Sequence, residues 1–99
     1  MVDRYLKWSD RALEDNRKPV DYLLNEWGPE IAQRVTDEID QTVTQIIAYP
    51  EHYPIYKRRK NIRRCVASPQ TTIYFKVSKD RVEIVTLFDN RQHPKKRKL

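Results

Sequence analysis

Two stretches in the first half of the chain carry apolar residues at the spacing of amphipathic helices. The second stretch predicts a helix from Pro29 to Tyr49-Pro50, with apolar steps of four, four, four, three and one. Its predicted buried stripe is Ile31, Val35, Ile39, Val43, Ile46 and Ile47, and its predicted outer face is Gln33, Arg34, Asp37, Glu38, Gln41, Thr44 and Gln45. Gly28 suits the left-handed position after a helix and Pro29 the first turn of the next, which predicts a tight antiparallel helical hairpin.

The first helical stretch is less regular. Ser9 is a good N-cap residue, and Asp10 suits the positive end of a helix. The apolar residues that follow at helical spacing are Leu13, Val20, Leu23, Leu24 and Trp27. Pro19 lacks the N–H that a helix interior needs and costs about 3 kcal/mol there, so we expect a kink or break near residues 16–19. We interpret Trp8 and Trp27 as core residues.

The period of the apolar pattern changes to that of β-strands in the second half. Strands are predicted at residues 4–8, 62–67, 72–77 and 82–88, with a loop at 50–54 and turns at 68–71 and 78–81. The last strand is apolar on both faces, which is typical of a central strand, so we place it between strand 72–77 and the short first strand. The predicted fold is α+β, in the order β-α-α-β-β-β, a four-stranded mostly antiparallel sheet with a two-helix hairpin packed on one face. We expect residues 1–92 to form a single domain and residues 93–99 to form a mobile basic tail.

Composition limits the classes of function that the chain can have. With 99 residues and a single Gly, it is one domain without a Gly-rich phosphate loop. A single Cys forms no internal disulfide, which is typical of a reducing cytosol. We find neither a signal peptide nor an apolar run of membrane-spanning length, and therefore expect a cytoplasmic protein without a membrane partner. His52 and His93 are isolated from other ligand types, so neither a metal nor a cofactor is expected.

Charge is divided unevenly between the two halves. Residues 1–55 hold 6 Lys or Arg and 11 Asp or Glu, net −5, whereas residues 56–99 hold 14 and 3, net +11. The run from Lys57 to Arg64 contains six cations and no acid. Such a field attracts polyanions, namely RNA, DNA or an acidic protein, although a solvated surface has the same composition.

Several motifs, taken in order, resemble the RelE/ParE superfamily of type II toxin–antitoxin toxins. They are Trp8-Ser9 with Arg11-Ala12-Leu13-Glu14-Asp15, Trp27-Gly28, Tyr49-Pro50-Glu51, Ile62-Arg63-Arg64, and Phe88-Asp89-Asn90-Arg91-Gln92-His93-Pro94. Pro19 departs from the family pattern, which usually has an apolar residue there. The resemblance implies a toxin neutralised by a cognate antitoxin that is encoded beside it. RelE-like members cut mRNA on the ribosome, and ParE-like members inhibit DNA gyrase.

Metal-free RNA cleavage needs cations that stabilise a phosphorane, together with a placed acid and base. RelE-like toxins supply these from the sheet and from a group near the C-terminus. The positions that fit are Lys57, Lys60, Arg63, Arg64, Arg91 and His93. Arg63 and Arg64 point to opposite faces of a strand, so only one of them can lie with Arg91 on the open face.

Each of these residues also has a structural interpretation. The cations from Lys57 to Lys60 suit a solvated loop, Arg91 suits an ion pair with Asp89, and His93 suits an exposed tail. Cys65 fits a small core residue better than a nucleophile. The tyrosines that can stack on bases, Tyr53, Tyr56 and Tyr74, also fit as sheet residues with wet hydroxyls.

The sequence therefore predicts a toxin, with a ribosome-dependent mRNA endoribonuclease as the leading hypothesis. The alternative is a ParE-like inhibitor of DNA gyrase without nuclease activity, and a third is a protein that binds antitoxin but has lost its toxicity. The expected partners are the antitoxin and either the ribosome with mRNA or gyrase. The antitoxin's acidic or amphipathic C-terminal segment would wrap the positive sheet face, adding a strand at an edge or a helix in a groove.

Overall fold

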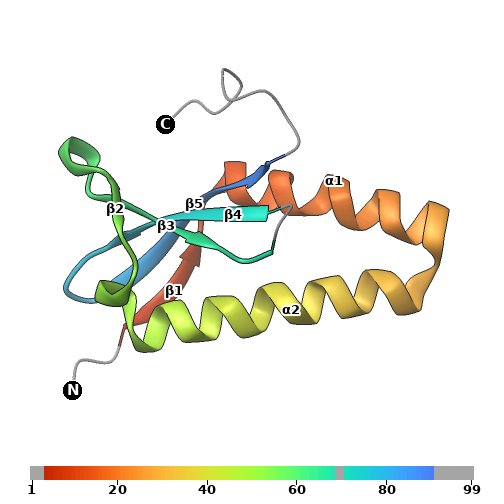
Figure 1. The fold of residues 1–99 in the computed structure, drawn as a ribbon, viewed down its shortest axis with the longest axis horizontal. Helices are drawn as coiled ribbons and strands as arrows, with labels where there is room; N and C mark the ends of the chain where they lie inside the picture. The colour runs from red at the N-terminus through yellow and green to blue at the C-terminus, as the bar shows by residue number, and fades with distance from the viewer. Residues whose placement is uncertain (1–3, 69–70, 91–99) are drawn as a thin grey trace.

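The computed structural model describes residues 4–68 and 71–90, in which two helices precede most of a β-sheet (Figure 1). The elements are β1 (Tyr5–Trp8), α1 (Asp10–Trp27), α2 (Pro29–Ala48), the 3₁₀ turn η1 (Pro50–His52), β2 (Ile55–Lys57), the 3₁₀ turn η2 (Arg58–Lys60), β3 (Ile62–Val66), β4 (Thr71–Val77) and β5 (Arg81–Asp89). None of the described helices has an apolar stretch long enough to cross a membrane.

The strand order of the sheet is β1-β5-β4-β3-β2. The prediction of a central last strand is confirmed, since β5 pairs in parallel with β1 and antiparallel with β4. The predicted number of strands is wrong, because β2 adds a fifth strand at the edge beside β3. The sheet is mostly antiparallel, as predicted, with β1 and β5 as its parallel pair. A three-residue strand shows too little alternation to be recognised in a sequence, which explains why residues 55–57 were not predicted as a strand.

The helical hairpin has the predicted order but a more regular first helix. The expected break near residues 16–19 is wrong, since α1 is continuous from Asp10 to Trp27. Both ends of the helix are held: the Ser9 side chain caps the Ala12 N–H, and the Gly28 N–H donates to the Leu23 carbonyl at 3.0 Å. The single backbone hydrogen bond that a proline removes is therefore not enough to divide the helix. The boundaries of α2 are as predicted, and its seven predicted outer residues are all exposed.

Gly28 joins the two helices in a backbone conformation that differs from the expected one. Its φ of 93° is positive, but its ψ of 171° lies outside the left-handed helical region. Residues with a Cβ almost never adopt this combination. A side chain at position 28 would be strained even though the space beside its Cα is open.

The sheet has a helix-covered face and an open face. On the covered face, Ala12 of α1 and Ile46 of α2 pack with Ile73, Phe75 and other sheet residues in the main core cluster. On the open face, Ile62, Tyr74 and Phe88 form a second, smaller cluster, with Tyr56 packed against it. In Figure 1 the two helices run antiparallel, and their connecting turn projects beyond the sheet.

Several apolar side chains of α1 are exposed. Trp27, which we interpreted as a core residue, has 67% of its surface exposed, so that prediction is wrong. Leu13 and Leu24 are 54% and 44% exposed, and they lie on the same side of the helix as Trp27 because they precede it by fourteen and three residues. Trp8 is half-buried and packs against the main core cluster, in agreement with its prediction. We name the exposed row Leu13, Leu24 and Trp27 the α1 stripe.

A β-bulge at Val85 changes which side chains of β5 reach the open face. The pairing of β4 with β5 moves from Phe75–Ile84 to Tyr74–Thr86, so Val85 is the extra residue. Its carbonyl accepts a hydrogen bond of 2.6 Å from the Ser9 hydroxyl, the same group that caps α1. Because of the extra residue, Phe88 lies on the open face while Ile84 lies in the main core.

Thr86 follows the bulge, is 2% exposed and donates its hydroxyl hydrogen bond to the carboxylate of Asp15 in α1. We expect Asp15→Ala to lower the free energy of unfolding by about 1–2 kcal/mol, because the Thr86 hydroxyl stays buried without its acceptor. The double variant Asp15→Ala/Thr86→Val should lose less than the sum of the two single changes. Urea titration measures all three values. Asp40→Ala at an exposed α2 position is the control, and additive losses would contradict the coupling.

Candidate functional site

Arg63 and Arg64 lie on opposite faces of β3, and the structure shows which of them is on the open face. Arg63 lies on the helix-covered side with Cys65, is half-buried, and donates a hydrogen bond of 2.7 Å to the Tyr53 carbonyl. Arg64 is exposed on the open face and pairs across the sheet with Tyr74. Arg63 therefore contributes to the folded structure, and Arg64 is the arginine of β3 that a partner can reach.

Arg64 belongs to an aromatic cluster. Its guanidinium carbon lies 5.9 Å from the ring centroid of Tyr56, and that ring meets Tyr74 edge-on with centroids 4.8 Å apart. Tyr74 is 1% exposed, so it fixes the position of Tyr56, which is half-buried. We name Tyr56, Arg64 and Tyr74 the Arg64 cluster. A cation over an aromatic face is held in a narrow set of orientations and remains available to an anion.

The remaining cations of the basic run form the end of the β2–β3 hairpin. Lys57 ends β2, and the three residues of η2 that follow, Arg58, Arg59 and Lys60, are all exposed. Asn61 then takes the left-handed conformation at φ 54° and donates its side-chain N–H to the Val77 carbonyl at 3.0 Å. We name residues 58–60 the basic tip. Its candidate residue Lys60 is thus placed at the outer end of the hairpin, between Tyr56 and Arg64 in the sequence.

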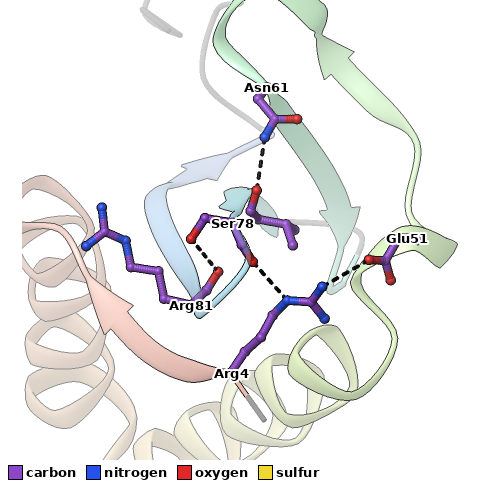
Figure 2. A network of polar contacts seen from close by, with 6 residues as sticks. Arg4, Glu51, Asn61, Ser78 and Arg81 are labelled. Carbon is purple, nitrogen blue, oxygen red and sulfur yellow. Dashed lines mark hydrogen bonds and ion pairs between the residues drawn. The ribbon is translucent and has the colours of Figure 1, made fainter. Parts of the chain in front are cut away.

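A network of hydrogen bonds around Arg4 fixes the β4–β5 turn (Figure 2). This turn directly follows Val77, whose carbonyl accepts the hydrogen bond from Asn61. Arg4 donates from Nε to the Ser78 carbonyl at 2.9 Å and from Nη2 to Glu51 Oε1 at 3.4 Å. The Ser78 hydroxyl also donates to the Arg81 carbonyl at 3.3 Å. The first strand, η1 and the β4–β5 turn are therefore held together beneath the hairpin that carries the basic tip.

The general acid and base that the sequence suggested are not placed at this site. Arg91 and His93 lie outside the described residues. The other histidine, His52, is exposed in η1, and its ring stacks on Tyr49 with centroids 5.1 Å apart. Among residues 4–68 and 71–90, no group of three His, Cys, Asp or Glu is arranged to hold a metal ion. Around Arg64, the described open face offers a cation and aromatic rings.

Cys65 is a core residue, as the sequence indicated. It is 7% exposed, and burial raises the pKa of its thiol, with a smaller opposing effect from a hydrogen bond to Tyr53. Burial likewise raises the pKa of the Tyr53 hydroxyl. A thiol that stays protonated at neutral pH is a poor nucleophile. The expectation of sheet tyrosines with wet hydroxyls is wrong for Tyr53, whose hydroxyl contacts this thiol, and for Tyr74, which is 1% exposed.

Ser9 was expected only as the N-cap of α1, and Asn61 was not among the expected site residues. An Asn directly after a cationic run is a signal for a left-handed turn residue, since Asn tolerates positive φ better than most side chains. The second role of Ser9, bonding the bulge carbonyl across the sheet, has no signal in the local sequence.

Comparison with known proteins places this arrangement among bacterial toxins. The family model described as ParE toxin of type II toxin-antitoxin system, parDE, matches residues 6–94. The chromosomal ParDE TA system of P. aeruginosa is similar in fold, with a TM-score of 0.75, 18% identity, and coverage of 88% of this chain and 96% of that one.

Two further solved structures share the fold at lower similarity. The E. coli DinJ-YafQ toxin-antitoxin complex gives a TM-score of 0.60 at 13% identity, covering 91% of this chain and 96% of that chain. YafQ of E. coli strain BL21(DE3) gives 0.57 at 14%, covering 89% and 94%. No curated protein sequence matches the chain. Because the family model spans nearly the whole domain, the chain belongs to the ParE toxin family of type II toxin–antitoxin systems.

Proposed function

We propose that this toxin arrests growth by binding and inhibiting DNA gyrase, and that it does not cut mRNA. The observation that carries the proposal is the match of the ParE family across residues 6–94, since inhibition of gyrase is the activity that the ParE-like resemblance implies. The open face is consistent with a binding role. Arg64 lies over Tyr56 and beside Tyr74, and this set contains a cation and two phenols but no carboxylate or imidazole.

Cleavage of mRNA on the ribosome is the second candidate. The Arg64 cluster favours it, because an exposed guanidinium stabilises phosphorane charge and an adjacent ring can stack on a base. In that mechanism Arg64 holds the scissile phosphate, Lys57 and Lys60 contact the RNA backbone, and Arg91 and His93 supply the remaining charge and the proton.

The two candidates differ in cells that express the toxin alone. We expect loss of negative supercoiling in a reporter plasmid while a reporter mRNA stays full-length. Cleaved transcripts with unchanged supercoiling would contradict the gyrase proposal. Both quantities should be followed in the same culture, because growth arrest by itself does not identify the target.

Replacement of Arg64 tests the same choice at the level of a residue. For a binding toxin we expect Arg64→Lys to change the inducer dose for growth arrest by less than about threefold, since one exposed charge pair contributes little to affinity. For a nuclease, a misplaced transition-state cation costs about a hundredfold or more. Arg34→Lys, at an exposed position on the acidic helix α2, is the matched control.

We further propose that the cognate antitoxin covers the α1 stripe with an amphipathic helix. Leu13, Leu24 and Trp27 present a row of apolar side chains on one side of α1. Exposed apolar rows of this kind are typical of helix-in-groove recognition, in which the partner supplies apolar residues at matching spacing. The positive sheet face remains the proposed place for an acidic part of the same segment.

A further inference from the structure

The basic tip holds three consecutive exposed cations and no acid. On the helices, Arg17 pairs with Glu14 at 2.7 Å and with Asp21 at 3.2 Å. At the N-terminal end of the sheet, Arg4 pairs with Glu51. Among the described residues, no ion pair joins Arg58, Arg59 or Lys60 to a carboxylate. The tip therefore keeps its full charge available for an external anion.

The geometry of the tip distributes that charge around its end. A 3₁₀ turn has three residues per turn, so successive side chains leave its axis about 120° apart. The three side chains of η2 therefore leave the backbone in different directions. This arrangement suits a ligand with regularly repeated charges on more than one side of the tip, which a nucleic acid backbone has.

The tip is also held in place before any ligand arrives. Asn61 closes η2 in a left-handed conformation, and its amide bonds to the Val77 carbonyl at 3.0 Å. The strand that leads into the tip, β2, is paired with β3. An anchored turn loses less conformational entropy on binding than a free basic loop does.

From the uncompensated charge, its divergent directions and this anchoring, we propose that the basic tip is a binding site for the phosphodiester backbone of a nucleic acid. Duplex DNA is expected to bind more tightly than single-stranded RNA, because its linear charge density is higher and more counterions are released for each contact. Binding at this site needs only the toxin and the nucleic acid, so it can be measured without gyrase.

The test measures binding of the purified full-length toxin to a fluorescent duplex DNA and to a single-stranded RNA over a range of KCl concentrations. The variant Arg58→Gln/Arg59→Gln/Lys60→Gln should bind the duplex at least about tenfold more weakly at low salt, with a log–log salt slope smaller by about 2 to 3. All three side chains are exposed, and a thermal melt identical to that of the wild type establishes that the variant is folded.

Two further variants make the test specific. Lys7→Gln/Arg17→Gln/Arg34→Gln removes the same formal charge from exposed positions on β1, α1 and α2, and should change the slope by less than about 1. Asn61→Gly keeps every cation and permits positive φ but removes the amide bond to Val77, so it should weaken binding without changing the slope.

Three results would overturn the proposal: equal losses in the tip variant and the charge-matched variant, a wild-type slope near zero, or tighter binding of an acidic peptide such as polyglutamate than of either nucleic acid. The last result would identify the tip as a protein-binding surface. Stronger binding of RNA than of DNA would keep the phosphodiester site and reverse its preferred ligand. None of these outcomes depends on gyrase, so the proposed target is tested separately.

Discussion

Replacing Phe75 by alanine is expected to lower the free energy of unfolding by about 3–5 kcal/mol. Phe75 is 0% exposed in the middle of β4, where it pairs with Ile84 of β5 and Arg63 of β3. The ring of Tyr53 meets it edge-on with centroids 5.8 Å apart. Truncation removes the transfer free energy of the ring and leaves a cavity between the sheet and the helices, and both effects destabilise the fold.

A loss of this size is a large part of the total stability of a domain of this length, so we expect Phe75→Ala to leave too little folded protein for a full titration. Phe75→Leu keeps most of the volume and should lose about 1–1.5 kcal/mol, which urea denaturation can measure. Tyr22→Ala is the aromatic control, since Tyr22 is 61% exposed and should lose less than about 0.5 kcal/mol. Similar losses for Phe75→Leu and Tyr22→Ala would contradict the assigned core.

The second large effect concerns the antitoxin. Trp27→Ala is expected to weaken the affinity of the toxin for its antitoxin by about 30-fold or more, because a tryptophan buried on binding is a common hot spot. Trp27 is 67% exposed in the toxin alone, so its removal should leave the unfolding free energy of the toxin nearly unchanged. Isothermal titration with the product of the adjacent reading frame measures the change.

Tyr22→Ala serves as the control here as well. Tyr22 is exposed on the same helix, but five residues from Trp27 and therefore about 140° around the axis, outside the α1 stripe. A wild-type affinity for Trp27→Ala together with a large loss for Tyr22→Ala would place the antitoxin on another side of α1. Loss in neither variant would exclude α1 as the main contact.

Much of the fold follows from residues that are near one another in the sequence. The apolar steps of Ile31 to Ile47 and the Gly28-Pro29 pair are enough to predict α2 and its connection to α1. The two-sided apolar character of residues 82–88 predicts a central β5. The features that the sequence did not predict depend on distant partners. Continuity of α1 across Pro19 and the pairing of Ile55–Lys57 with β3 are decided by packing rather than by local preference.

In the candidate site, too, some features follow from the local sequence and others depend on distant residues. The alternation of a strand predicts that Arg63 and Arg64 separate to opposite faces, but not which face the helices cover. That choice depends on Cys65 and Phe75, which pack beneath the helices and take Arg63 with them. Trp27 was misjudged for a related reason. An apolar residue at helical spacing is buried only where the sheet extends beneath it, and the hairpin turn projects beyond the sheet (Figure 1).

The central position of β5 also determines the order in which a newly made toxin can assemble. The ribosome makes α1 and α2 early, while β5, which joins β1 to the rest of the sheet, is among the last elements to emerge. Until residues 81–89 are available, β1 has no strand to pair with, Ser9 has no bulge carbonyl to bond, and Tyr74 lacks its neighbour Phe88. The α1 stripe lies on an element made well before β5. An antitoxin that recognises this stripe can therefore meet its site on the nascent chain before the toxin's sheet is complete.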